Sequence, residues 1–381
     1  MKILMVEPFF GGSHKEWIEG FSNSSSFEVD LLTLPAKTWK KRMQEGAVTL
    51  AEEFNKKIST PELIVASDML NLETFLELTR SRTRNIPTAI YFHENQMTYP
   101  WSPKEKDVEK KRQEFGLINL VSAKVAVKIF FNSKYHMDSF FSALPEFFKS
   151  YPRLFEPRFE AMLKAKSKVL YPGMDIIKLK KSIESRESIE SEKEALPLVL
   201  WNHRWEYDKN PAEFCEALSV LAKEGLDFEV AILGEIPRGS EREFLKYKER
   251  LGGRVIQSGF LKSREEYAKW LSRADVLPVT SVHDFFGFSV VEAIYMGAWP
   301  ILPRRLAYPE HIPERLHREV FYETFEELVS MLRCAIKNKK KNKEKIKKDR
   351  ELKKSLERYD WSFLAKEYEA EFERVVVENI K

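Results

Sequence analysis

A pair of carboxylates around a glycine turn is the most informative feature of the second half of the sequence. Asp284 precedes Gly287, and Glu292 follows about one turn into a predicted helix. Both carboxylates can face one pocket, where each would accept hydrogen bonds from vicinal hydroxyls such as those of a sugar. The apolar surroundings of Glu292 disfavour a purely structural role.

Two cations flank another junction between a strand and a helix, in the segment WNHRWEYDKNP (201–211). Arg204 and Lys209 precede a helix that is predicted to begin after Asn210, with Pro211 at its first position. A diphosphate bound there would gain paired charge and backbone N–H groups. The structural alternative is a pair of solvated charges.

In the first half, a pair of glycines follows the first predicted strand. Gly11 and Gly12 lack a Cβ, so the backbone can approach a phosphate at the following helix N-terminus. Ser13 and Glu16 have the spacing of a capping box. The alternative is an ordinary turn.

Four polar residues stand at and directly after the end of the predicted strand 88–93, where α/β enzymes place working side chains. They are His93, Glu94, Asn95 and Gln96. The alternative is a histidine whose hydrogen bonds are satisfied at a strand end. This segment is not a zinc motif of the HExxH type, because Met97 stands where the second histidine must be.

Motifs of several other enzyme classes are absent from the sequence. It contains no GxGxxG, GxxxxGK[ST] or GxSxG motif and no metal-spaced Cys/His set. Dinucleotide oxidoreductases, P-loop kinases, serine hydrolases and zinc enzymes therefore lose support, and we expect neither a metal nor a cofactor.

Two parallel sheets are needed to position these residues. Short apolar runs alternate with amphipathic patterns, and the predicted strands are 2–7, 29–34, 62–67, 88–93, 124–131 and 168–172, then 197–202, 228–233, 254–258, 275–279 and 299–302. Such alternation predicts parallel sheets covered by helices, hence two doubly wound domains. Ligands of these sheets bind at the carboxyl ends of the strands, so we expect the site in a cleft between the domains.

The expected domains are as follows. The first covers 1–176, a charge-dense linker covers 177–196, and the second domain covers 197–356. An amphipathic C-terminal helix over 357–381 is expected to pack back toward the first domain.

The composition is that of a globular protein. The 381 residues are 43% hydrophobic and 32% charged, with both signs mixed. Cys215 and Cys334 form no disulfide framework, which favours a reducing cytoplasm. The most apolar windows are interrupted by charge, and the opening MKILMVEPFF is too short a run for a signal peptide, so we expect no stable membrane insertion. No protein partner is evident.

Positive charge is concentrated late in the chain. The formal net charge is +4, yet residues 337–354 contain eleven Lys or Arg and three Asp or Glu. Such a run is either a solvated helix face or a contact for the phosphate backbone of a nucleic acid.

The two motifs of the second half resemble those of a known enzyme group. Asp284 and Glu292 around Gly287 resemble the E-x7-E signature of GT-B enzymes in glycosyltransferase family four, and Arg204 with Lys209 resembles their diphosphate-binding pair. A narrower resemblance covers nearly the whole chain. In order and spacing, EPFFGGSHKEW, YFHENQMTYP, FNSKYHMDSF, HRWEYDKNP, HDFFGFSVVEA and YPEHIPE look like the tRNA-queuosine alpha-mannosyltransferase family. Asp284 departs from the signature, and its shorter side chain would lose or shift a contact with the sugar.

The resemblance implies a GT-B enzyme with two Rossmann-like domains that transfers mannose from GDP-mannose to queuosine in tRNA and retains the anomeric configuration. It implies that His93 touches the transferred sugar, that Arg204 and Lys209 hold the diphosphate, and that Glu292 binds the ribose. The further implied donor-binding residues are the phosphate-facing Gly11, Gly12 and Ser13, the capping Phe286, Gly287 and Phe288, and Phe260 and Leu261 at the base. On the acceptor side the candidates are Glu94, Asn95, Gln96 and Asn119.

Three alternatives stay open. The first is a GT-B hexosyltransferase that uses another sugar nucleotide and a lipid or glycan acceptor, although a basic run outside the first domain favours nucleic acid over membrane. The second is a sugar-nucleotide isomerase or hydrolase on the same scaffold, and the third is a non-catalytic tRNA-binding module.

Overall fold

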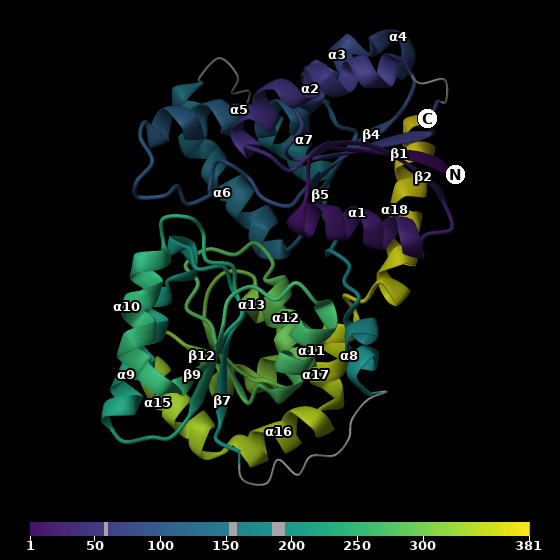
Figure 1. The fold of residues 1–381 in the computed structure, drawn as a ribbon. Helices are drawn as coiled ribbons and strands as arrows, with labels where there is room; N and C mark the ends of the chain where they lie inside the picture. Colours follow the sequence, from purple (N-terminus) through teal and green to yellow (C-terminus); the bar gives the residue numbers. More distant parts are fainter. Residues whose placement is uncertain (57–59, 152–157, 185–194, 381) are drawn as a thin grey trace. The chain divides into compact units, whose positions relative to one another are not determined.

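The structure is a computed structural model that describes residues 1–56, 60–151, 158–184 and 195–380. The chain divides into two compact units, which are Met1–Met174 with Trp361–Lys381 (unit 1) and Asp175–Asp360 (unit 2). In the described ranges each unit contains a six-stranded parallel sheet with helices packed against it (Figure 1). The prediction of two doubly wound parallel sheets is confirmed.

The sheet of unit 1 has the strand order β2-β1-β3-β4-β5-β6. Its strands are β1 Lys2–Phe10, β2 Glu28–Pro35, β3 Leu63–Ser67, β4 Thr88–Phe92, β5 Lys128–Phe131 and β6 Ser167–Val169. Its helices are α1 Gly12–Ser24, α2 Trp39–Lys56, α3 Leu72–Leu78, α4 Arg80–Thr83, α5 Val108–Val125, α6 Lys134–Ser150, α7 Phe159–Ala165 and α18 Trp361–Ile380. Strands β3 and β4, LIVAS and TAIYF, are buried along their whole length because helices cover both faces of the sheet.

Helix α18 completes unit 1 although it is the last element of the chain (Figure 1). The indole of Trp361 packs so closely on Gly20 and Gly173 that a Cβ at either position would overlap it. The hydroxyl of Tyr368 accepts a hydrogen bond from Nε1 of Trp17 at 3.0 Å and donates one to the carbonyl of Tyr171 at 2.8 Å. These aromatic contacts bury one face of the helix against α1.

The sheet of unit 2 has the strand order β12-β11-β10-β7-β8-β9. Its strands are β7 Leu198–Trp201, β8 Glu229–Ile232, β9 Val255–Ser258, β10 Val276–Pro278, β11 Trp299–Pro303 and β12 Phe321–Tyr322. Its helices are α8 Ile176–Glu184, α9 Pro211–Lys223, α10 Glu241–Leu251, α11 Arg264–Arg273, α12 Phe288–Tyr295, α13 Tyr308–His311, α14 His317–Val320, α15 Phe325–Lys337, α16 Lys339–Lys348 and α17 Arg350–Glu357, with short 3-10 turns at Tyr207–Lys209, Gly252–Arg254 and Glu314–Leu316.

Some element boundaries differ from the expected ones. The first part of the expected linker forms α8, which packs against α11 in unit 2, and residues 185–194 lie outside the described part of the chain. Strand β5 begins at Lys128 rather than at residue 124, because α5 continues to Val125. No helix among the described residues combines the length and the apolar character that crossing a bilayer requires.

Candidate active site

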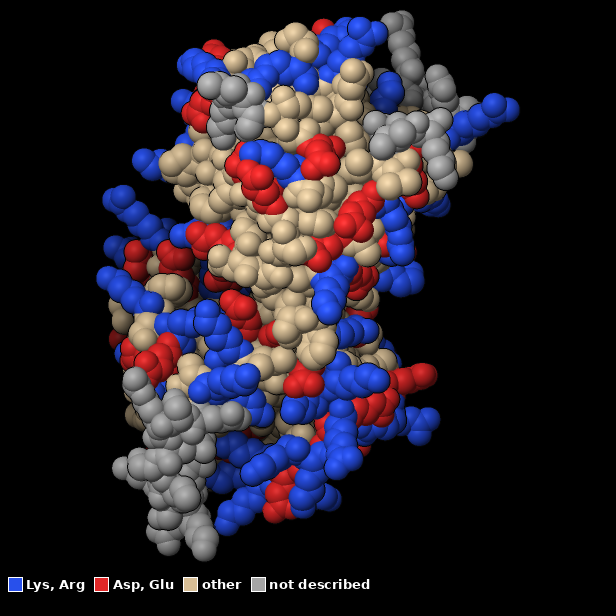
Figure 2. Space-filling view, turned by 90° about the vertical axis from the view of Figure 1, so that its right-hand side faces the viewer, with Lys and Arg blue, Asp and Glu red and all other residues tan. Residues whose placement is uncertain are grey.

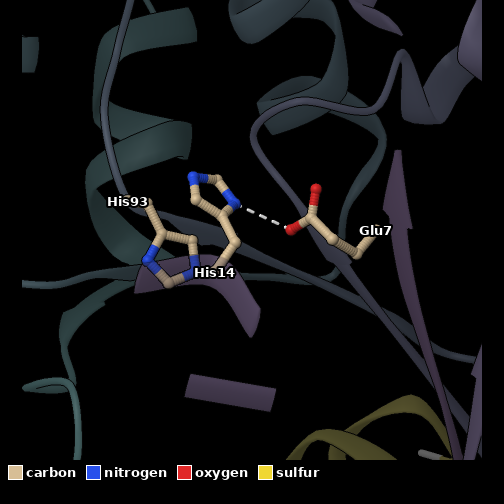
Figure 3. Close-up of side chains that lie close together, drawn as sticks. All are labelled: Glu7, His14 and His93. Carbon is tan, nitrogen blue, oxygen red and sulfur yellow. Dashed lines mark hydrogen bonds and ion pairs between the residues drawn. The ribbon is translucent and has the colours of Figure 1, made fainter. Parts of the chain in front are cut away.

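The carboxyl ends of β1 and β4 bring together three buried ionisable side chains, Glu7, His14 and His93 (Figure 3). Glu7 lies on β1, His14 in the first turn of α1, and His93 directly after β4. Nδ1 of His14 is 2.8 Å from Oε2 of Glu7, and the His14 and His93 ring centroids are 4.1 Å apart. The structure therefore places the predicted His93 against an ion pair that the sequence motifs did not identify.

At neutral pH one of the two histidines is charged and the other is neutral. Burial opposes the charge on His14, but the carboxylate of Glu7 outweighs it and raises the pKa of His14 to about 9. Burial lowers the pKa of His93 well below its usual range, and the neighbouring His14 lowers it further. His14 is thus an imidazolium, and His93 is a neutral imidazole that can donate one hydrogen bond and accept another.

Asp68, directly after β3, lies beside His93. The backbone N–H of His93 donates to Oδ1 of Asp68 at 2.7 Å, and Asp68 is fully buried. Burial raises the pKa of Asp68 well above its usual value, His14 opposes that change, and Glu94 adds to it. Asp68 follows the buried LIVAS strand just as His93 follows TAIYF, and that position was the signal for it in the sequence.

The predicted acceptor-side residues share this edge of the sheet. Nε2 of Gln96 donates to Oε1 of Glu94 at 2.7 Å, and the backbone N–H of Gln96 donates to Oδ1 of Asn119 at 2.8 Å. Nδ2 of Asn119, from α5, donates to the carbonyl of Asp68 at 3.0 Å. The structure thus joins Asn119, which lies far from the other residues in sequence, to the loop after β4. Asn95 is fully buried in that loop.

The same cluster offers the ligand types of a metal site. One atom each from Glu7, His14 and His93 lies within 4.8 Å of the others. However, the facing atoms of Glu7 and His14 already form an ion pair, and the imidazole rings lie against each other. We therefore interpret the cluster as an ion pair beside a neutral histidine, and a reaction without a metal stays a prediction.

The glycine turn after β1 differs from expectation in one respect. Gly11, not Ser13, is the N-cap of α1, and no side chain caps the helix, so the predicted capping box is wrong. A Cβ on Gly11 would lie 2.5 Å from the Cβ of Ala36, whereas Gly12 has a φ of +52° and faces open space. The first glycine permits close packing, and the second leaves room at the helix N-terminus.

In unit 2, Lys209 forms the centre of a buried network of charges. Its Nζ lies 3.2 Å from Oδ2 of Asp208 and 3.4 Å from Oδ2 of Asp284, and it donates to the carbonyl of His283 at 2.8 Å. Burial favours the neutral amine, but the carboxylates of Asp284 and Asp208 raise the pKa of Lys209. Asp284, the residue that departs from the signature, also accepts a hydrogen bond from the hydroxyl of Tyr308.

Arg204 occupies a different environment from Lys209. Its side chain is 55% exposed and lies 3.2 Å from the carboxylate of Glu206, whereas the side chain of Lys209 is only 12% exposed. The structure thus places both predicted cations in the turn between β7 and α9, one exposed and one buried.

Glu292 lies on α12, and Gly287 directly precedes this helix. Glu292 is buried, forms an ion pair with Arg264 and accepts a hydrogen bond from the hydroxyl of Tyr267 at 3.1 Å. These two partners from α11 were not predicted. Gly287 is the N-cap of α12 with a φ of +93°, a conformation that favours glycine.

The remaining predicted donor-binding residues have mixed surroundings. Phe286 is buried, and its carbonyl lies 2.7 Å from Nε2 of His311. Phe288 begins α12 and packs against the Phe286 ring. Phe260 is 66% exposed and Leu261 is partly buried, both in the loop after β9.

The basic run forms α16, and several of its lysines have intramolecular partners. Lys339 donates to the carbonyl of Ala195, Lys343 lies 3.2 Å from Asp275, and Lys345 pairs with Glu319. Ala195 and Asp275 lie just before β7 and β10, so α16 crosses the amino ends of these strands, opposite the edge that carries Lys209. Figure 2 shows Lys and Arg side chains gathered on unit 2 with Asp and Glu among them.

Comparison with protein families identifies both halves of the chain. Residues 2–174 match the family described as tRNA-queuosine alpha-mannosyltransferase N-terminal, and residues 182–352 match glycosyl transferases group 1. The chain is 32% identical over 318 residues to the tRNA-queuosine alpha-mannosyltransferase of Drosophila melanogaster, which covers 82% of each chain. A 2-deoxystreptamine glucosyltransferase of Streptomyces kanamyceticus is 30% identical over 101 residues, 26% of each chain.

Solved structures show the fold. HepE of Anabaena in complex with UDP has a TM-score of 0.64 at 15% identity and covers 98% of this chain and 100% of its own. Sucrose-phosphate synthase of Thermosynechococcus elongatus has a TM-score of 0.70 at 13% identity and covers 99% and 100%. Both have the GT-B fold, which this chain shares. The relative from Drosophila and the two family matches show that the chain belongs to the tRNA-queuosine alpha-mannosyltransferase family of glycosyltransferases.

Proposed function

We propose that the protein transfers mannose from GDP-mannose to queuosine in tRNA and retains the anomeric configuration. The observation that carries this proposal is the match to a relative with that acceptor and sugar in its name over 82% of both chains. Because the proposed substrate is tRNA, we propose that the protein acts in the cytoplasm.

Unit 2 supplies the groups for the donor. Arg204 and Lys209 would hold the diphosphate, and the N-terminus of α12 at Gly287 would add backbone N–H groups. Once the donor is bound, these groups would stabilise the negative charge that develops on the leaving diphosphate. Glu292 would accept hydrogen bonds from the ribose, in competition with its partner Arg264.

Lys209 must change partners when a diphosphate binds. In the structure its charge is balanced by Asp208 and Asp284. A phosphate oxygen would compete with these carboxylates for the same ammonium, and Asp284 would then be available for sugar hydroxyls. Asp284 can serve both as a partner of Lys209 and as a sugar ligand, because its side chain, although shorter than that of Glu, already reaches Lys209.

Unit 1 supplies a neutral hydrogen-bonding group for the transferred sugar. His93 remains uncharged at neutral pH, so it can bind a hydroxyl without pairing with the diphosphate. Gly11, Gly12 and Ser13 would face the phosphate. The acceptor hydroxyl attacks on the face from which the diphosphate leaves, and a donor phosphate oxygen takes its proton.

The test is product analysis. The protein is incubated with GDP-mannose and tRNA that contains queuosine, the tRNA is digested to nucleosides, and mass spectrometry searches for queuosine with one added hexose. Release of mannose from that nucleoside by an α-mannosidase, and not by a β-mannosidase, is expected for retention. Arg204→Ala is the matched inactive control.

Each other outcome contradicts one part of the proposal. Release of GDP without an adduct on queuosine contradicts the acceptor, and a panel of glycan and lipid acceptors then follows. An adduct formed only with a different sugar nucleotide contradicts the donor. No turnover with any sugar nucleotide contradicts catalysis itself.

A further inference from the structure

Two segments of unit 1 that lie far apart in the sequence, residues 37–45 and 101–114, form one aromatic and basic surface. The ring centroids of Trp39 and Trp101 are 5.6 Å apart, and both indoles are only partly buried. The ammonium of Lys40 lies 5.6 Å from the ring centroid of Trp39 and 5.4 Å from that of Trp101. We call this surface, with the two indoles at its centre, the tryptophan patch.

The tryptophan patch lies at the carboxyl edge of the sheet of unit 1. Trp39 follows β2, and Trp101 belongs to the long loop between β4 and α5, which contains neither helix nor strand. Both rings pack in one apolar cluster with Phe9 at the end of β1 and with Met69, which follows β3. A long irregular loop in a compact domain usually carries function. The loop begins at His93, so an acceptor bound there has the rest of its molecule at the edge that carries the patch.

The tryptophan patch is basic. It contains nine Lys or Arg and five Asp or Glu, so it alone carries a net charge equal to that of the whole chain. The ammonium of Lys40 lies 2.8 Å from the carboxylate of Glu105, an ion pair that joins the two segments. Lys37, Lys104 and Lys110 are exposed and have no ion-pair partner among the residues that the structure describes. These three ammonium groups can bind phosphates.

Single-stranded RNA matches this combination of groups, because its bases stack on aromatic rings and its phosphates bind lysines. In the proposed reaction the acceptor nucleoside leaves the base stack to reach the site, which exposes the faces of neighbouring bases. We propose that the tryptophan patch binds the RNA that flanks the acceptor nucleoside. Trp39 and Trp101 stack on a base, and the exposed lysines of the patch bind phosphates. This inference rests on the proposed function and identifies the surface that holds its substrate.

A membrane is the other anionic surface that basic and aromatic residues bind. A helix that lies in a membrane surface needs an exposed apolar face. The apolar side of α2 packs in the core of unit 1, where Leu50 and Phe54 are buried. Its exposed side carries Glu45, Glu52 and Glu53. The patch therefore favours RNA, whose phosphates and bases require no apolar helix face.

The experiment measures binding of queuosine-containing tRNA to the whole chain over a series of salt concentrations. Trp39→Ala and Trp101→Ala should each weaken binding about tenfold, because stacking of one base contributes on that order, and should leave the salt dependence unchanged. Trp101→Phe, which keeps an aromatic ring, should retain most of the affinity. Replacing the three exposed lysines together by Ala should flatten the slope of log affinity against log salt by roughly two to three.

Trp270 provides a matched control. It is a partly exposed tryptophan on α11 of unit 2, and the guanidinium of Arg273 lies 4.4 Å from its ring centroid. Trp270→Ala thus removes a similar pair of a cation and an indole, and it should leave the affinity for tRNA unchanged. Melting temperatures show whether each variant is folded. If an Ala variant of the patch does not fold, Trp101→Phe and the triple lysine variant, which alters only exposed side chains, still decide the outcome.

The wild-type protein separates failure of this inference from failure of the proposed function. If the wild type adds a hexose to queuosine while every patch variant binds tRNA as tightly as the wild type, the patch is refuted and the proposed function stands. A wild type that binds no tRNA refutes both. If the patch variants lose binding to vesicles of anionic lipid but keep their affinity for tRNA, the patch is a membrane contact and the inference is overturned.

Discussion

The buried ion pairs of the two units differ in the cation that each uses. In unit 1 the cation is His14, which holds its proton only while Glu7 stabilises it. In unit 2 it is Lys209, whose pKa lies above its usual value through Asp284 and Asp208. The first charge is lost at moderately alkaline pH, and the second persists. The site around His14 in unit 1 therefore loses its positive charge as the pH rises through about 9. The site around Lys209 in unit 2 keeps its positive charge over the same range of pH.

The two edges also differ in the groups that surround the buried cation. In unit 1 the side chains of Glu7, Asp68 and Glu94 all raise the pKa of His14, with Glu7 the largest contributor. In unit 2 a phosphate would compete with Asp284 for Lys209, and a ribose would compete with Arg264 for Glu292.

The largest effect is expected from removal of Lys209. Lys209→Met leaves Asp208 and Asp284 buried without their cation, and loss of one partner of a buried pair costs about 3–5 kcal/mol of unfolding free energy. Chemical denaturation should show this loss near neutral pH, together with loss of turnover. Lys209→Arg, which keeps the charge, is the control, and equal stability of Lys209→Met and wild type would contradict a buried pair.

Removal of Arg204 should affect turnover alone. The Arg204 side chain is 55% exposed, so its pair with Glu206 contributes little to stability. Its predicted contact with the leaving diphosphate should lower turnover by about 10²–10³-fold in Arg204→Ala. Steady-state kinetics measure the turnover, and melting curves measure the stability. Near-normal turnover would show that Arg204 does not bind the diphosphate.

Removal of Glu7 should reveal the titratable pair. The pKa of His14 is raised from 6.5 to about 9 in the folded protein, so the ion pair stabilises fully below pH 6.5 and is lost as the pH rises through 9. The difference in unfolding free energy between wild type and Glu7→Gln should be up to about 3 kcal/mol near pH 6 and should close toward pH 9–10. Denaturant titrations across this range measure it, and a pH-independent difference would exclude His14 as the titrating group.

The smallest effect concerns the salt dependence of tRNA binding. Lys340 and Lys341 belong to α16, which crosses the amino ends of β7 and β10. Replacing both by Ala should therefore leave the slope of log affinity against log salt nearly unchanged. Lys15 and Lys37 follow β1 and β2, at the edge that carries His93. Their replacement should flatten the slope by about one for each lysine. The reverse result would move the RNA contact to α16.

Local sequence patterns predict the strands and the turns that carry chemistry, because both depend on neighbouring residues. The apolar runs locate β3 and β4, and polar residues after a buried strand locate His93 and Glu94. Partners such as Arg264 for Glu292 come from separate elements that only the strand order brings together. The capping-box prediction at Ser13 was wrong because the N-cap of α1 is Gly11. The distant Ala36, which leaves no room for a Cβ at Gly11, is likewise a neighbour that local sequence does not reveal.

The return of α18 to unit 1 has a consequence for the order of events on the ribosome. The first 174 residues leave the exit tunnel long before Trp361, because all of unit 2 is translated between them. At roughly 5–20 residues per second that interval lasts on the order of ten seconds or more. Until then Trp17, Phe21 and Tyr91 lack the aromatic cover that Tyr368 provides. The nascent first unit therefore exposes an apolar surface during synthesis, and chaperones have time to bind it.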